Sequence, residues 1–137
     1  MSGLIATARA ELADALTDAL ASFPRTVRVF TEMPSVITPP CIVIGERTPL
    51  AVSDNSAPRT FTVQLEAVLL AATAGAANMV ETADQLADHI IEALLDTDLA
   101  PLSVASYSIL TAADQQPYLA ARIPVALGPY TIEKQGE

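Results

Sequence analysis

The sequence predicts a single α+β domain in which two helices pack on one face of a mainly antiparallel or mixed sheet. The length of 137 residues fits one domain. Hydrophobic residues make up 51% of the chain, enough to form a buried core. Helical and strand periodicities follow one another in the order α-β-β-β-α-β-β. Strands joined by turns form mainly antiparallel pairs, and one face of such a sheet can support both helices.

The first element is an amphipathic helix over residues 3–22. Its apolar side chains recur at three- and four-residue steps, which places them on one face. These positions are Ile5, Ala8, Leu12, Leu16, Ala19 and Leu20. We expect Ser2 to be the N-cap. Pro24 ends the helix, because a residue that precedes proline is held out of the α region.

Two strands and a long loop follow this helix. Residues 25–31 alternate in polarity and are rich in β-branched side chains, which favours a strand. After a proline-rich break, residues 41–45 form a short apolar strand that we expect to be covered on both faces. Residues 46–59 (ERTPLAVSDNSAPR) are predicted to form a polar loop with two prolines and an Asp-Asn-Ser turn. Loops of this length inside a compact domain tend to be functional or disordered.

Residues 60–71 show the clearest strand pattern. One face is apolar from Phe61 to Leu69, at every second position. The other face is polar as far as Glu66 and then becomes apolar at Val68 and Leu70. The pattern therefore predicts an outer sheet face that is solvated at one end and covered at the other.

The second helix is predicted over residues 77–95, with one apolar and one acidic stripe. The apolar stripe comprises Val80, Ala83, Ala87, Ile90, Ile91 and Leu94. The acidic stripe comprises Glu81, Asp84, Asp88 and Glu92. A helix of this pattern buries the first stripe and exposes the second.

Two further strands, residues 103–111 and 118–127, complete the sheet. Pro124 has no backbone N–H to donate, so we expect a sheet edge or a bulge at this position. Glu66 and Arg122 both lie on the outer, polar face of their strands. If the two strands are neighbours, these side chains are expected to form an ion pair across the sheet.

The charge and the single cysteine exclude several classes of function. Lys and Arg total 7 against 16 Asp and Glu, for a net charge of −9. A nucleic-acid or anionic membrane partner needs a basic patch, and the basic residues are spread along the chain. They are Arg9, Arg25, Arg28, Arg47, Arg59, Arg122 and Lys134. Cys41 lies in an apolar run and is interpreted as a small buried side chain. No signal peptide or membrane span is apparent, so a reducing cytoplasm is expected.

The sequence offers few residues for catalysis or metal binding. His89, the single histidine, is either a general base or metal ligand or, on the favoured interpretation, a surface or boundary residue of its helix. Asp84 and Asp88 form either a two-carboxylate cation site or, as favoured, part of a solvated helix face. No nucleotide-binding, nucleophile-elbow or zinc-protease motif occurs. We therefore expect no enzymatic activity, no catalytic or metal-binding residues and no cofactor.

Five segments carry a resemblance to a known family. They are ELADALTDAL, PPCIVIGE, RTFTVQLEAVLLA, ANMVETADQLADHIIEALL and QPYLAARIPVAL. In their order along the chain, their lengths and their residue patterns, these segments resemble the tail terminator proteins of long-tailed bacteriophages, also described as tail-completion or minor tail proteins. The resemblance covers nearly the whole chain. It implies a sheet with helices on one side and no catalytic residues.

The same resemblance implies a role in the virion, at the neck-proximal end of the tail, after assembly in the host cytoplasm. The protein would form a hexameric ring that caps the tail tube and ends tube polymerisation. Its partners would be its own copies, the major tail tube protein and the head–tail connector or head-completion protein. DNA would pass through the ring without sequence-specific binding. An acidic lumen is the corresponding hypothesis, and a lumen lined by Arg25, Arg28, Arg47 and Arg59 would contradict it.

The predicted loop over residues 46–59 is the candidate for contact with these partners, because a loop can become ordered on docking. The alternative for this segment is a surface loop with no partner. The candidate contact residues are Glu46, Arg47, Thr48, Pro49, Leu50, Asp54, Asn55 and Arg59. Two other functions remain open: another head–tail joining or neck component of the same particle, and a small cellular ligand-binding α+β domain.

Overall fold

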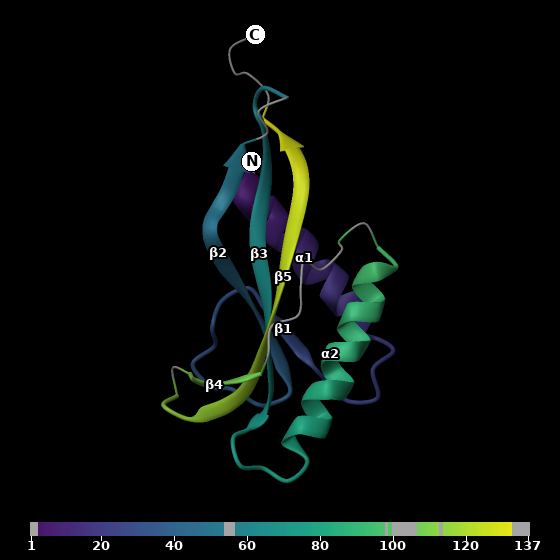
Figure 1. The fold of residues 1–137 in the computed structure, drawn as a ribbon, viewed down its shortest axis with the longest axis vertical. Helices are drawn as coiled ribbons and strands as arrows, with labels where there is room; N and C mark the ends of the chain where they lie inside the picture. Colours follow the sequence, from purple (N-terminus) through teal and green to yellow (C-terminus); the bar gives the residue numbers. More distant parts are fainter. Residues whose placement is uncertain (1–2, 54–56, 98, 100–106, 113, 133–137) are drawn as a thin grey trace.

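The computed structural model describes residues 3–53, 57–97, 99, 107–112 and 114–132. These residues form two helices and five strands, which confirms the predicted α+β class and order of elements. The elements are α1 (Leu4–Leu20), β1 (Arg28–Phe30), β2 (Cys41–Ser53), β3 (Thr60–Thr73), α2 (Met79–Leu95), β4 (Ser108–Thr111) and β5 (Pro117–Thr131) (Figure 1).

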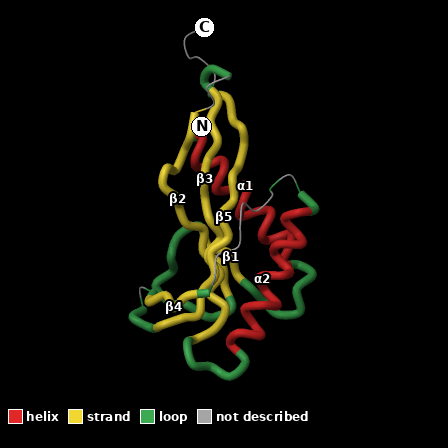
Figure 2. The backbone as a smooth tube through the Cα atoms, in the orientation of Figure 1, coloured by secondary structure: helices red, strands yellow, loops and turns green. Residues whose placement is uncertain are grey.

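The strands form one mixed sheet in the order β1-β2-β3-β5-β4. β1 runs parallel to β2, and all other pairs are antiparallel. The two outer strands are short: β1 pairs with residues 41–43 of β2, and β4 pairs with residues 117–120 of β5. The other ends of β2, β3 and β5 therefore project as a three-stranded arm, toward the top of Figure 2. We define the arm as residues 46–53, 60–65 and 125–131.

Both helices pack on one face of the sheet, where the main core lies. Leu12 and Leu16 of α1 and Leu86 and Ile90 of α2 are fully buried there. The central strands contribute alternate side chains, because successive residues of a strand point to opposite faces. From these strands the core receives Ile42, Ile44, Val63, Leu65, Ala67, Leu69, Ala121, Ile123, Val125 and Leu127.

The opposite, outer face is covered at one end only, as the sequence predicted. Val68 and Leu70 are buried there in a second cluster, against Ile37 of the segment between β1 and β2. At the solvated end, the Arg122 guanidinium donates a hydrogen bond to Glu66 Oε1 at 3.1 Å, which confirms the predicted ion pair. Pro124 lies on the part of β5 that β4 does not reach, which confirms an edge at this position.

The prediction of a loop over residues 46–59 is wrong for residues 46–53, because β2 continues to Ser53. Glu46 stands opposite Leu65 and Ala51 stands opposite Val63, so residues 47–50 bulge out opposite Gln64 alone. We call residues 47–50 the bulge. A bulge accommodates extra residues without ending the strand, so the polar and proline-containing sequence remains within the sheet.

Other predicted boundaries also change. The strand predicted at 25–31 shortens to Arg28–Phe30, the residues that find partners on β2. In α2, Val80 is 50% exposed and Leu86 takes its place in the buried stripe. Gly3 is the N-cap of α1, whereas the predicted cap Ser2 lies outside the described residues. The predicted strand 103–111 is described as β4 from Ser108 onward.

Candidate functional site

His89 joins the two helices rather than forming a reactive centre. Its Nε2 atom lies 2.6 Å from the carbonyl oxygen of Ala19, near the end of α1. Because a carbonyl oxygen only accepts, Nε2 carries the proton and donates it to this bond. The imidazole also lies 3.3 Å from the Ser22 hydroxyl and contacts the Phe23 ring edge to face, at 5.1 Å between ring centres. This side chain therefore satisfies a carbonyl at the end of a helix, where the last carbonyls lack partners.

Cys41 is a buried thiol, as the sequence predicted. Its side chain is 1% exposed, within the outer-face cluster. Burial raises the pKa of the thiol to about 11, so the nucleophilic thiolate is scarce at neutral pH. Cys41 lies on the face opposite to the helix layer that contains His89, and the fold does not bring the two together.

The acidic stripe of α2 is exposed along the outside of the helix layer. The Tyr107 hydroxyl donates a hydrogen bond to Asp84. Burial, followed by this bond, raises the pKa of Tyr107 to about 12. Within the part of the chain that the structure describes, no group of three or more acidic, histidine or cysteine side chains is arranged to hold a metal ion.

The candidate contact residues take part in internal contacts of the arm. Glu46 pairs with Arg9 of α1 at 2.7 Å. The Arg47 guanidinium donates to the side-chain oxygen of Gln64 at 3.0 Å, and the Gln64 amide donates to the Pro49 carbonyl at 3.2 Å. These two bonds hold the bulge against β3.

The remaining candidates differ in what they present to solvent. Leu50 packs partly buried against the main core, whereas Thr48 is exposed. Arg59 adopts a positive φ of 63° and donates to the Ile132 carbonyl. Asp54 and Asn55 lie outside the described residues.

Sequence reasoning missed two exposed apolar side chains at the arm. Val52 of β2 and Ile132, just after β5, are each 42% exposed. The apolar run of residues 50–52, which ends on the β-branched Val52, is the signal that could have placed this side chain on a strand. Exposed apolar side chains at the end of a projecting sheet suit contact with another protein.

The open edges of the arm carry features that discourage strand addition. On β2, the bulge and Pro49 interrupt the regular spacing of backbone donors and acceptors. On β5, Pro129 has no N–H to offer a neighbouring strand, and neither has Pro124, which immediately precedes the arm. The arm, whose inner face is covered by α1, is therefore suited to contact through its outer face and exposed side chains rather than through extension of the sheet.

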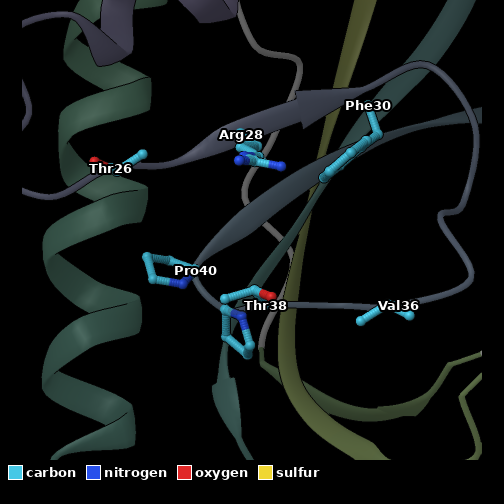
Figure 3. Close-up of a pocket in the computed structure, with 7 residues that line it drawn as sticks. Thr26, Arg28, Phe30, Val36, Thr38 and Pro40 are labelled. Atoms are coloured by element: carbon cyan, nitrogen blue, oxygen red, sulfur yellow. The ribbon is translucent and has the colours of Figure 1, made fainter.

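A hollow of about 290 Å³ lies on the outer face, beside β1. Thr26, Arg28 and Phe30 lie along one wall, opposite Val36, Thr38 and Pro40 of the segment that follows β1 (Figure 3). Arg28 is the charged residue of its lining, and the rest of the lining is apolar or carries a hydroxyl.

Comparison with known proteins gave no family assignment: neither a scan against protein-family models nor a search of the curated proteins matched the chain. Neither α1 nor α2, the helices of the described residues, is long and apolar enough to cross a membrane.

Proposed function

We propose that this protein is a structural virion protein, a tail terminator of a long-tailed bacteriophage. In this proposal several copies, six by the resemblance, form a ring on the end of the tail tube. The ring ends tube polymerisation and offers a docking face to the head–tail connector. No chemical step is involved, and the function lies in contacts between subunits.

The observation that carries the proposal is the one-sided sheet. Its two helices cover one face, while the outer face is open beyond the second cluster and the arm projects from it. This is the arrangement that the resemblance implies. A fold with exposed side chains on both its helix layer and its outer face can use two different surfaces toward two neighbours, as a ring requires.

The protected edges of the arm support an assembly of finite size. Long sheet edges that remain free favour open-ended pairing. The bulge on β2 and the prolines on β5 oppose it. A closed ring that stops tube growth is consistent with these features.

Electron microscopy tests the proposal at two levels. The purified protein is expected to form rings of uniform diameter in negative stain, with a matching mass by native mass spectrometry. Particles assembled without the protein are expected to carry overlong tails. Tails of normal length without heads would instead identify a head–tail joining or neck component, and a monomer at all concentrations would argue against both.

A further inference from the structure

The hollow beside β1 combines a free positive charge with exposed apolar surface. Phe30 packs with the outer-face cluster, so this hollow opens on the side of the sheet away from the helices. Arg28 is exposed, and the ion pairs among the described residues involve Arg9 and Arg122 instead. Val36 on the opposite wall is 75% exposed. Arg25 extends the positive charge, because a second hollow that it lines shares Pro39 with the first.

The outside of α2 has the complementary character. Ala83, Leu86 and Ile90 face the core, so Glu81 and Asp88 point away from the sheet. Two exposed apolar side chains accompany these carboxylates, Val80 at 50% and Leu95 at 62% exposure. This surface belongs to the helix layer, whereas the hollow beside β1 opens on the outer face. Arg25 lies between the two, because the second hollow that it lines also includes Thr82 of α2.

We propose that α2 of one copy docks into the hollow beside β1 of the next copy. The inference rests on the proposed function, for which it names the contact between subunits. The carboxylates of α2 would meet Arg28 and Arg25 of the next copy, and the exposed apolar side chains of α2 would meet Val36. In a chain of net charge −9, two copies repel each other unless acidic and basic surfaces face one another.

The spacing of the charges is compatible with this contact. Glu81 and Asp88 are seven residues apart on a helix, which places them on the same side at about 10 Å along the axis. Arg25 and Arg28 are three residues apart, and such a segment spans at most about 10 Å. Each arginine can therefore approach a different carboxylate of the same helix.

The contact is heterologous, because it joins two different surfaces. Each copy keeps one free helix face and one free hollow until the assembly closes. Repetition of one such contact yields a ring if the rotation between copies closes and a filament if it does not. The inference thus explains how a single chain could build the proposed ring.

Charge reversal tests the contact. Arg28→Glu and Asp88→Lys are each expected to raise the protein concentration needed for assembly about tenfold or more, measured by light scattering after size-exclusion chromatography. The double variant Arg28→Glu/Asp88→Lys restores opposite charges and is expected to assemble within about threefold of the unchanged protein. An equimolar mixture of the two single variants is also expected to assemble, because each supplies the surface that complements the other.

Asp14→Lys is the matched control for Asp88→Lys, since Asp14 is an exposed acidic residue of α1 and both substitutions change the net charge in the same direction by the same amount. It is expected to leave assembly unchanged, and circular dichroism verifies the fold of every variant. Equal assembly of all variants, or a double variant that assembles as poorly as the single ones, would contradict the proposed contact between α2 and the hollow. Neither result would contradict the proposed ring. An unchanged protein that stays monomeric would remove both the contact and the proposed function.

Discussion

At the scale of single residues, the few chemically distinctive side chains serve the fold. His89 satisfies a backbone carbonyl at the end of α1, and Cys41 fills the outer-face cluster. Tyr107, Tyr118 and Tyr130 donate hydrogen bonds to Asp84, Asp114 and Glu11. The bonds from Tyr107 and Tyr130 join segments that are far apart in sequence, whereas the Tyr118–Asp114 bond closes the turn before β5. Removal of these contacts is therefore expected to change stability.

His89→Ala is expected to lower the free energy of unfolding by about 0.5–1.5 kcal/mol, because the Ala19 carbonyl loses the shorter of its two side-chain hydrogen bonds and keeps only the one from the Ser22 hydroxyl. Urea denaturation followed by circular dichroism measures the change. Glu92→Ala, an exposed position one turn further along α2, serves as the control and is expected to stay within about 0.5 kcal/mol of the unchanged protein. Equal stability of the two variants would show that the bond to α1 contributes nothing.

Cys41 is expected to make the protein less stable in alkali. Its pKa is raised from 9.0 to about 11 by burial, so the unfolded chain loses the thiol proton before the folded chain does. Stability from this group is complete below pH 9 and is lost as the pH rises toward 11. Cys41→Ala is expected to flatten this part of the pH–stability curve, although it lowers stability at neutral pH by removing a buried atom. An unchanged slope between pH 9 and 11 would contradict the assignment.

At the scale of elements, the structure separates the buried from the solvated positions of α2. Ile90→Ala is expected to destabilise the protein by about 2–5 kcal/mol, because the side chain is fully buried and leaves a cavity. Val80→Ala on the same helix is expected to change stability by less than about 0.5 kcal/mol, since half of the side chain is exposed. Thermal unfolding of both variants distinguishes this arrangement from the apolar stripe read from the sequence, which included Val80.

The bulge provides a second prediction at this scale. Gln64→Ala removes the acceptor for Arg47 and the donor to the Pro49 carbonyl. Amide hydrogens of residues 46–53 are expected to exchange about tenfold faster, because a stabilisation of about 1 kcal/mol or more is lost locally. Thr62→Ala, on the same face of β3, is the control. Equal exchange in the two variants would mean that the bulge is held by other contacts.

Periodicity predicted the elements well where packing follows it. Residues 60–71 alternate cleanly, and this strand lies at the centre of the sheet with its outer face covered at Val68 and Leu70. The Glu66–Arg122 pair followed from the same alternation. The prediction for residues 46–53 was wrong because their turn-forming residues suggested a loop. In the structure, Gln64 of β3 holds residues 47–50 in a bulge within the strand. Side-chain contacts between distant residues leave no local periodicity to recognise.

At the scale of the whole molecule, the proposed function rests on the distribution of surfaces. The helix layer presents the acidic stripe of α2, the outer face presents a hollow lined by Arg28, and the arm extends beyond β1 and β4. The sequence showed the acidic stripe but not the hollow, because Arg28 and Val36 are brought together only by the turn between β1 and β2. A surface that forms from two short irregular segments has no pattern that sequence reasoning can detect.

The proposed contact between copies is expected to weaken with salt, because it would depend on opposite charges at the surface. Raising the ionic strength from about 0.05 M to about 0.5 M should shift the assembly midpoint to higher protein concentration. Sedimentation velocity measures this shift. The variant Arg28→Glu should show a smaller dependence on salt, and a midpoint that strengthens with salt would point to an apolar contact instead.

The position of β5 has a consequence for biosynthesis. This strand is the last element of the described chain to leave the ribosome, yet it occupies an interior place in the sheet, beside β3. Until it arrives, β3 lacks one neighbour and the main core lacks Ile123, Val125 and Leu127. Nascent chains that stop before residue 117 should therefore stay unfolded and sensitive to proteases. Only finished copies would then be competent to join the proposed ring, and truncated products would be kept out of it.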